Sequence, residues 1–207
     1  MRNAERGLTK LNCMGKGRLE AFSDGVMAII ITIMVLEMKV PEGDKLADLQ
    51  PLIPVFMSYI LSFVMVAIYW NNHHHLMHAT HKINGSAMWA NSHLLFWLSL
   101  LPFASGWMGE NHFSSIPTAL FGVDLFMAGV AYYILAKCLV KLHGEDSTLG
   151  RAVGNDTKGK ISVVVYAAGI ALAYFNGWIS LVLYALVAII WFIPDQRIER
   201  KLEEETK

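Results

Sequence analysis

The stretch NNHHHLMHATH, residues 71–81, is rich in imidazole side chains, which are common ligands of zinc and copper. Its histidines are His73, His74, His75, His78 and His81. His74 and His78 are spaced to share one face of a helix, but no cysteine or carboxylate accompanies the run. The pattern therefore favours a structural or pH-sensing role. A membrane metal-binding protein that uses this run is an alternative, although we expect neither a bound metal nor a cofactor.

A second candidate is Asp124, a carboxylate inside an apolar stretch that also contains Lys137 near its end. A carboxylate in a membrane is costly and usually meets a polar partner. We expect Asp124 to form a hydrogen bond between helices, with proton transfer in a secondary ion transporter as the alternative. The sequence contains no paired nucleophile and base, no phosphate-binding loop and no cofactor motif, so we do not expect an enzyme.

The segment RLEAFSDGVMAIIITIMVLEMKVP, residues 18–41, combines a charged start with a nearly continuous apolar run. At about 100° per residue, Ile29, Ile33 and Leu36 form one stripe of a helix, and Thr32 flanks it. Ser23 and the neighbouring aspartate and glutamate point elsewhere. The stripe faces lipid, another helix or a symmetry axis, and periodicity alone does not choose among them. The Thr32 hydroxyl either faces the same way as the stripe or bonds to the carbonyl of residue 28.

These residues must be positioned by an unusually apolar chain. Of its 207 residues, 55% are apolar and only 16% are charged, against about 25% charged in soluble domains. The pattern predicts an all-α, polytopic membrane protein with a single domain covering residues 1–207. The last apolar run is too long for one span and has the turn signal Asn176-Gly177 at its centre. The six expected transmembrane helices cover about residues 20–38, 53–71, 86–104, 116–139, 161–176 and 178–193.

Lysine and arginine are unevenly distributed among the connections, which predicts the orientation in the membrane. They gather before the first helix, after the fourth and in the tail that contains Arg197, Arg200, Lys201 and Lys207. Both termini are therefore expected in the cytoplasm, which requires an even number of spans. The first apolar run lacks a cleavage site, so we expect it to be retained. Cys13 and Cys138 match no metal or redox spacing, and zero net charge gives no reason to expect a nucleic-acid partner.

The residues Arg18, Phe22, Ser23 and Asp24 resemble the R-x-x-x-F-S-D signature of the TMEM175 family of potassium channels, at the start of the first helix where that family has it. Further similarity lies in Trp70-Asn-Asn-His73-His74, Asn91 and Pro102. The resemblance implies that the signature residues hold the first helix to the second and third. Candidate partners are Trp70, His73, His74, Asn91 and His93. Arg18 lies nearer the stripe than Asp24 does, so lining the cytoplasmic mouth is an alternative for it.

One copy of the signature implies a homotetramer in the membrane lipid, with four first helices around a central pore. The family's constriction maps to Ile29, and further pore-facing positions map to Thr32 or Ile33 and to Leu36. Aliphatic side chains offer no oxygen to replace an ion's water, and potassium loses water more cheaply than sodium. The resemblance therefore implies a passive cation channel that admits monovalent ions and modestly prefers potassium.

Overall fold

The computed structural model describes residues 2–154 and 157–192, and these residues form helices without a β-strand. The long helices are α1 (Arg2–Leu36), α2 (Ile53–His78), α3 (Gly85–Glu110), α4 (Ser115–His143), α6 (Thr157–Leu172) and α7 (Gly177–Phe192). Two short helices, η1 (Leu46–Leu52) and α5 (Thr148–Val153), lie in connections. The all-helical architecture agrees with the fold class expected from the sequence.

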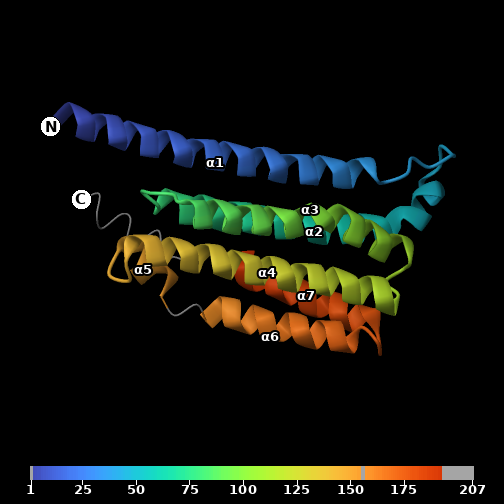
Figure 1. Cartoon of the computed structure of the whole chain (residues 1–207). Coiled ribbons are helices and arrows are strands. Elements are labelled where there is room, and N and C mark those ends of the chain that lie inside the picture. Colours follow the sequence, from blue (N-terminus) through green and yellow to red (C-terminus); the bar gives the residue numbers. More distant parts are fainter. Residues whose placement is uncertain (1, 155–156, 193–207) are drawn as a thin grey trace.

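The long helices run side by side, with α1 along one edge of the bundle (Figure 1). Helix α1 packs against α3 and α2, α3 packs against α4, and α4 packs against α6 and α7. Helix α7 also contacts α2, so α2, α4, α6 and α7 enclose the part of the bundle farthest from α1. As a result, α1 has neighbours on one side only.

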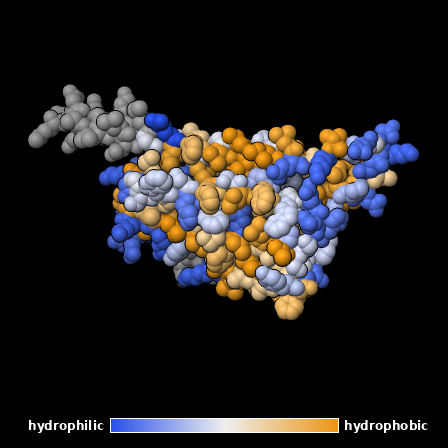
Figure 2. Space-filling view, turned by 45° about the vertical axis from the view of Figure 1, so that its right-hand side comes forward, coloured by the Kyte–Doolittle hydropathy of each residue, from blue (hydrophilic) through white to orange (hydrophobic). Residues whose placement is uncertain are grey.

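Among the residues that the structure describes, three helical segments are long and apolar enough to cross a membrane: Gly15–Leu36, Leu46–His78 and Ser115–His143. A shorter apolar helix covers Gly177–Phe192. Many large apolar side chains are exposed on the chain, and Figure 2 shows them over the middle of the visible face, with hydrophilic residues towards both ends. An apolar belt between polar ends is the surface expected of a multi-pass membrane protein.

Several helices extend beyond the bounds expected from the apolar runs. Helix α1 begins at Arg2 instead of residue 20, α2 continues to His78 instead of 71, and α3 continues to Glu110 instead of 104. The apolar run marks the part suited to lipid, whereas backbone hydrogen bonding continues through polar helix-compatible residues. In α2, a polar side chain also bonds to the helix backbone: Asn72 Nδ2 donates to the Ile68 carbonyl at 2.8 Å. The expected basic tail lies in residues 193–207, outside the described residues.

The connection between α6 and α7 is a turn at residues 173–176, which divides the last apolar run. The Asn176 side-chain oxygen accepts a hydrogen bond from the Trp178 backbone N–H at 2.9 Å and so stabilises the start of α7. Farther along α7, the buried Tyr184 ring lies against Gly122 of α4 and Gly169 of α6. Its hydroxyl donates to the Thr118 carbonyl at 3.3 Å. Glycine is needed at both positions because a Cβ there would collide with the ring.

Candidate functional site

A buried chain of hydrogen bonds joins α1, α3 and α2 at the sequence motif. The Ser23 hydroxyl donates to the Leu19 carbonyl at 2.8 Å, and Asn91 Nδ2 donates to Ser23 Oγ at 2.9 Å. The other end of the same amide, Asn91 Oδ1, lies 2.8 Å from His73 Nε2. Since Oδ1 only accepts, His73 must carry its proton on Nε2 and donate it. Ser23, His73 and Asn91 are at most 1% exposed, so each contact replaces one that water would otherwise make.

A second contact holds α1 to α2 beside this chain. The Trp70 indole Nε1 donates to Asp24 Oδ1 at 3.0 Å, and the His74 ring stacks on Trp70 with 5.9 Å between ring centroids. The indole N–H has no acceptor role, so its direction in this contact is unambiguous. Together the two sets of contacts determine how α1 is rotated about its own axis on α2 and α3.

Three residues nominated from the sequence take no part in these hydrogen bonds between helices: His93, Arg18 and Phe22. The only hydrogen bond of the His93 ring among the described contacts is with Trp97 Nε1 on its own helix, at 2.9 Å. Arg18 is exposed, and Phe22 is 59% exposed within the chain. By helical geometry both point within about 20° of Ile29. The interhelical role expected for Arg18 and Phe22 stays a prediction.

The side of α1 opposite the packed one carries the stripe found in the sequence. Ile29 is 58%, Ile33 41% and Leu36 81% exposed in the single chain, and Thr32 beside them is also exposed. We call these four residues the outer stripe. By contrast, Met27, Ile30 and Met34 are at most 3% exposed, because they face α2 and α3. Helix α1 thus has one face buried against its neighbours and one face of exposed aliphatic side chains.

The Thr32 hydroxyl donates to the carbonyl of Ile29 at 2.8 Å, and not to the carbonyl of residue 28, which was one of the two options for it. The hydroxyl is exposed at the same time, so the two options considered for Thr32 are compatible. Because the proton is used along the helix, the lone pairs of Oγ1 remain for an acceptor role at the outer stripe.

Asp124 of α4 is 4% exposed, and neither carboxylate oxygen has a hydrogen-bond partner among the described residues. The expected interhelical hydrogen bond is therefore wrong. The nearby Tyr69 hydroxyl donates to the Leu125 backbone carbonyl at 3.4 Å instead. Lys137 does not approach the carboxylate in any described contact, and its Nζ lies 5.5 Å from the centroid of the Tyr133 ring.

His73, His74, His75 and His78 lie in the last two turns of α2, whereas His81 lies in the connection that follows. Within the described residues, no group of three or more His, Cys, Asp or Glu side chains is arranged to hold a metal ion. A contact that the sequence did not suggest involves His143 at the end of α4. Its Nε2 accepts hydrogen bonds at 3.1 Å from the backbone N–H groups of His81 and Lys82, and the His81 and His143 rings are 6.3 Å apart. This contact holds the α2–α3 connection to α4.

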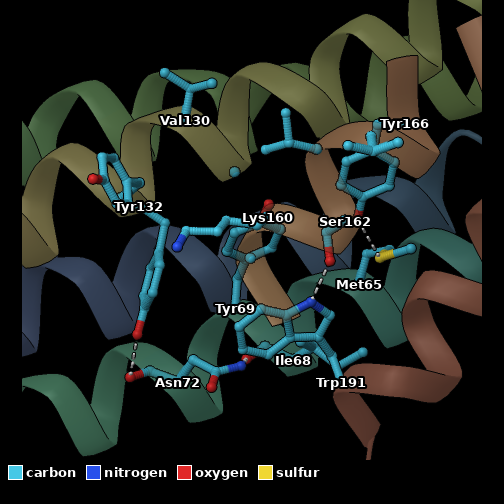
Figure 3. Close-up of a pocket in the computed structure, with 15 residues that line it drawn as sticks. Met65, Ile68, Tyr69, Asn72, Val130, Tyr132, Lys160, Ser162, Tyr166 and Trp191 are labelled. Carbon is cyan, nitrogen blue, oxygen red and sulfur yellow. Dashed lines mark hydrogen bonds between the residues drawn. The ribbon is translucent and has the colours of Figure 1, made fainter. Parts of the chain in front are cut away.

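Sequence reasoning also missed a cavity of about 430 Å³ between α2, α4, α6 and α7, shown in Figure 3. It is lined mainly by apolar and aromatic side chains, among them Met65, Tyr69 and Tyr166. Gly129 of α4 is also part of its wall. The glycine at position 129, inside an apolar helix, was the available signal, but a glycine carries no information about which helix lies opposite it.

Comparison with known proteins identifies the family. The family model described as the endosomal/lysosomal potassium channel TMEM175 matches residues 18–102. A potassium channel from a Chryseobacterium species is 55% identical over 191 residues, which cover 92% of this chain and 100% of the relative. The endosomal/lysosomal proton channel TMEM175 of Homo sapiens is 33% identical over 103 residues, or 44% of this chain and 20% of the human one.

A solved structure shares the fold. The crystal structure of a lysosomal potassium-selective channel TMEM175 homolog from Chamaesiphon minutus superposes with a TM-score of 0.74 at 23% sequence identity. The match covers 87% of this chain and 97% of the other. With a relative of 55% identity matched along its whole length, the chain belongs to the TMEM175 family.

Proposed function

We propose that the chain forms a potassium-preferring cation channel, in which four copies surround a central pore lined by the outer stripe of α1. The observation that carries this proposal is the one-sided packing of α1. Ile29, Ile33 and Leu36 remain between 41% and 81% exposed, while the opposite face of the same helix is closed against α2 and α3. The potassium-channel names of the bacterial relatives support the choice of ion.

The proposed constriction is a ring of four Ile29 side chains. Aliphatic groups narrow the path without supplying oxygen ligands, so an ion must lose part of its water to pass. Potassium loses water at lower cost than sodium, and the resulting preference is modest. Thr32 lies about one turn farther along, and its outward lone pairs would provide a weak ring of oxygen acceptors beyond the constriction.

Arg18 and Phe22 continue the outer stripe towards the N-terminal end of α1 and belong to the same proposal. Their exposure within the chain suits contacts between subunits at the pore mouth. We place this end in the cytoplasm because the lysines and arginines of the connections gather there. With both termini on that side, α1, α2, α3, α4, α6 and α7 would be the six spans.

Flux in proteoliposomes of the purified protein tests the function directly. We expect potassium uptake without a co-substrate, exceeding sodium uptake under equal gradients. Ile29→Asn should raise the flux and reduce the preference for potassium, because an amide replaces the aliphatic ring with hydrogen-bonding groups. Unchanged permeation in Ile29→Asn would contradict the assignment of the pore.

The matched control is Ile189→Asn, which makes the same change on α7 at a residue that is 60% exposed but far from α1. It should leave both the flux and the ion preference unchanged. A pH gradient should be imposed in parallel, because the human relative is named a proton channel. Flux that saturates and requires a counter-ion would instead indicate a transporter, with the unpaired Asp124 as the next residue to replace.

A further inference from the structure

The cavity between α2, α4, α6 and α7 is separate from the proposed pore. None of its lining residues comes from α1, which lies along one edge of the bundle in Figure 1, or from α3. Its volume of about 430 Å³ is within the range of about 300–1,000 Å³ typical of small-molecule sites. The channel mechanism makes no use of this space.

Most of the cavity wall is suited to a hydrocarbon chain. Met65 and Ile68 of α2, Val130 of α4 and Val163 of α6 contribute apolar surface. Polar groups in the wall bond to other protein atoms: the Trp191 indole donates to Ser162 Oγ at 2.7 Å, and the Tyr132 hydroxyl donates to the Asn72 carbonyl at 3.2 Å. An apolar cavity of this kind stays free of water and takes an apolar occupant.

Part of the cavity wall reaches the outer surface of the bundle. Two of its lining residues, Tyr133 of α4 and Val164 of α6, are 48% and 68% exposed. Helix α4 is one of the segments suited to cross a membrane, so this exposed part of the wall faces lipid. A lipid acyl chain can therefore enter from the side without passing through water.

Positive charge lies at one end of the cavity. Lys160 near the start of α6 lines the cavity, and in Figure 3 its side chain extends across it towards Tyr132. The Lys158 ammonium lies 6.0 Å from the centroid of the Trp191 ring, which is also part of the wall. Both lysines belong to the end of the bundle where basic residues gather, the level at which lipid headgroups lie.

From this combination, we propose that the cavity binds one acyl chain of an anionic phospholipid, whose headgroup phosphate pairs with Lys160. The chain occupies the apolar space between α4 and α6, and the phosphate remains at the rim. Because the site lies apart from α1, this binding does not depend on whether the protein conducts potassium.

Native mass spectrometry of the purified full-length protein in mild detergent tests the proposal. Phosphatidylglycerol and phosphatidylcholine with identical acyl chains are titrated in turn. We expect tighter binding of phosphatidylglycerol, weakened about fivefold by Lys160→Gln, since one lysine near an anionic lipid surface contributes about that factor. Lys141→Gln, at an exposed lysine of the α4 end outside the cavity, should change nothing. Equal binding of the two lipids would overturn the preference for a headgroup of net negative charge, and an unchanged affinity in Lys160→Gln would overturn the pairing of the phosphate with Lys160.

A pair of substitutions at Gly129 tests the acyl-chain site. An added Cβ would lie 3.6 Å from the Tyr69 hydroxyl, an ordinary contact, so Gly129→Ala should fold and still bind lipid. Gly129→Leu fills the cavity and should abolish retention of either lipid. If Gly129→Leu does not fold, Val164→Trp at the exposed rim should block access to the cavity instead. Undiminished lipid binding in a folded cavity-filling or rim-blocking variant would show that the lipid binds elsewhere.

Discussion

Asn91 uses both ends of its single amide in contacts with different helices. Its nitrogen donates to Ser23 of α1, and its oxygen accepts from His73 of α2. Because the Ser23 proton is directed to the Leu19 carbonyl, every proton in this chain of bonds has one defined position. Removing the central residue would leave buried groups unsatisfied on both neighbours, which costs more than the hydrogen bonds themselves contribute.

Asn91→Ala should therefore destabilise the protein by about 1–3 kcal/mol, the cost of leaving buried polar groups without partners. Thermal unfolding in detergent, followed by circular dichroism, measures the effect as a lower melting temperature. Ser92→Ala is the control at the next position, because Ser92 is exposed and its hydroxyl bonds only to the Met88 carbonyl one turn back. Equal melting temperatures for the two variants would mean that the Asn91 contacts contribute little.

The sequence was informative about these residues to a limited degree. It nominated Trp70, His73 and Asn91 as neighbours of the motif, and all three lie there, because polar groups in apolar helices must find one another. It also nominated His93, whose ring bonds within its own helix instead. Asn91 and His93 are two residues apart, so they face nearly opposite sides of α3. The sequence alone does not say which of these sides is buried, because that depends on where the neighbouring helices lie.

At the scale of whole elements, α2 and α3 approach closely where α2 begins and α3 ends. Gly109 of α3 is fully buried against the first turn of α2. A Cβ at this position would lie 2.7 Å from Val55 Cα and 2.5 Å from Ser58 Oγ. Since backbone atoms are involved, the helices would have to move apart to accept a side chain.

Gly109→Ala should lower the free energy of unfolding by about 1–3 kcal/mol through overpacking, despite the better helix propensity of alanine. Gly85→Ala, at the start of the same helix, adds its Cβ where no atom lies within 4 Å and should be neutral or slightly stabilising. Comparing their melting temperatures with that of the unchanged protein checks the prediction. A neutral result for Gly109→Ala would mean that α2 and α3 separate easily.

The helices themselves were easier to predict than their ends. The apolar centre of each expected segment lies within one of the long helices, because the period and length of an apolar run are properties of the chain alone. The second helix was expected to end at about residue 71, yet α2 continues to His78 through most of the histidine run. Histidine and asparagine neither favour nor terminate a helix strongly, so the end is determined by contacts such as that of His143 with the following connection.

At the scale of the whole molecule, α1 is attached by one face, and its contact with Trp70 determines where the other face points. If Asp24 is replaced by alanine, the acceptor of the Trp70 N–H is lost and α1 is less firmly oriented on α2. The outer stripes of neighbouring copies would then meet less regularly. Association in a membrane depends on such close packing, because lipid is as apolar as the stripe.

Asp24→Ala should accordingly reduce the fraction of protein that forms the proposed tetramer, measured by light scattering after size exclusion in detergent. Glu20→Ala serves as the control, because the described ion pair of Glu20, 3.8 Å from Lys16, lies within α1. An unchanged tetramer fraction in Asp24→Ala would mean that the Trp70 contact does not orient α1 for assembly.

The same one-sided attachment limits how the pore of such an assembly opens. Helix α1 contains no proline between Gly15 and Leu36, so it lacks the commonest cause of a sharp kink, and a rotation about its own axis is one way for it to move. Ile29 and Thr32 differ by about 60° around its axis. A turn of that size would bring the Thr32 hydroxyl onto the line that faces the axis, and it would require the hydrogen bonds of Ser23 to Asn91 and of Asp24 to Trp70 to break. Wetting of the narrowest point would then follow from a rotation, without any widening of the ring of helices.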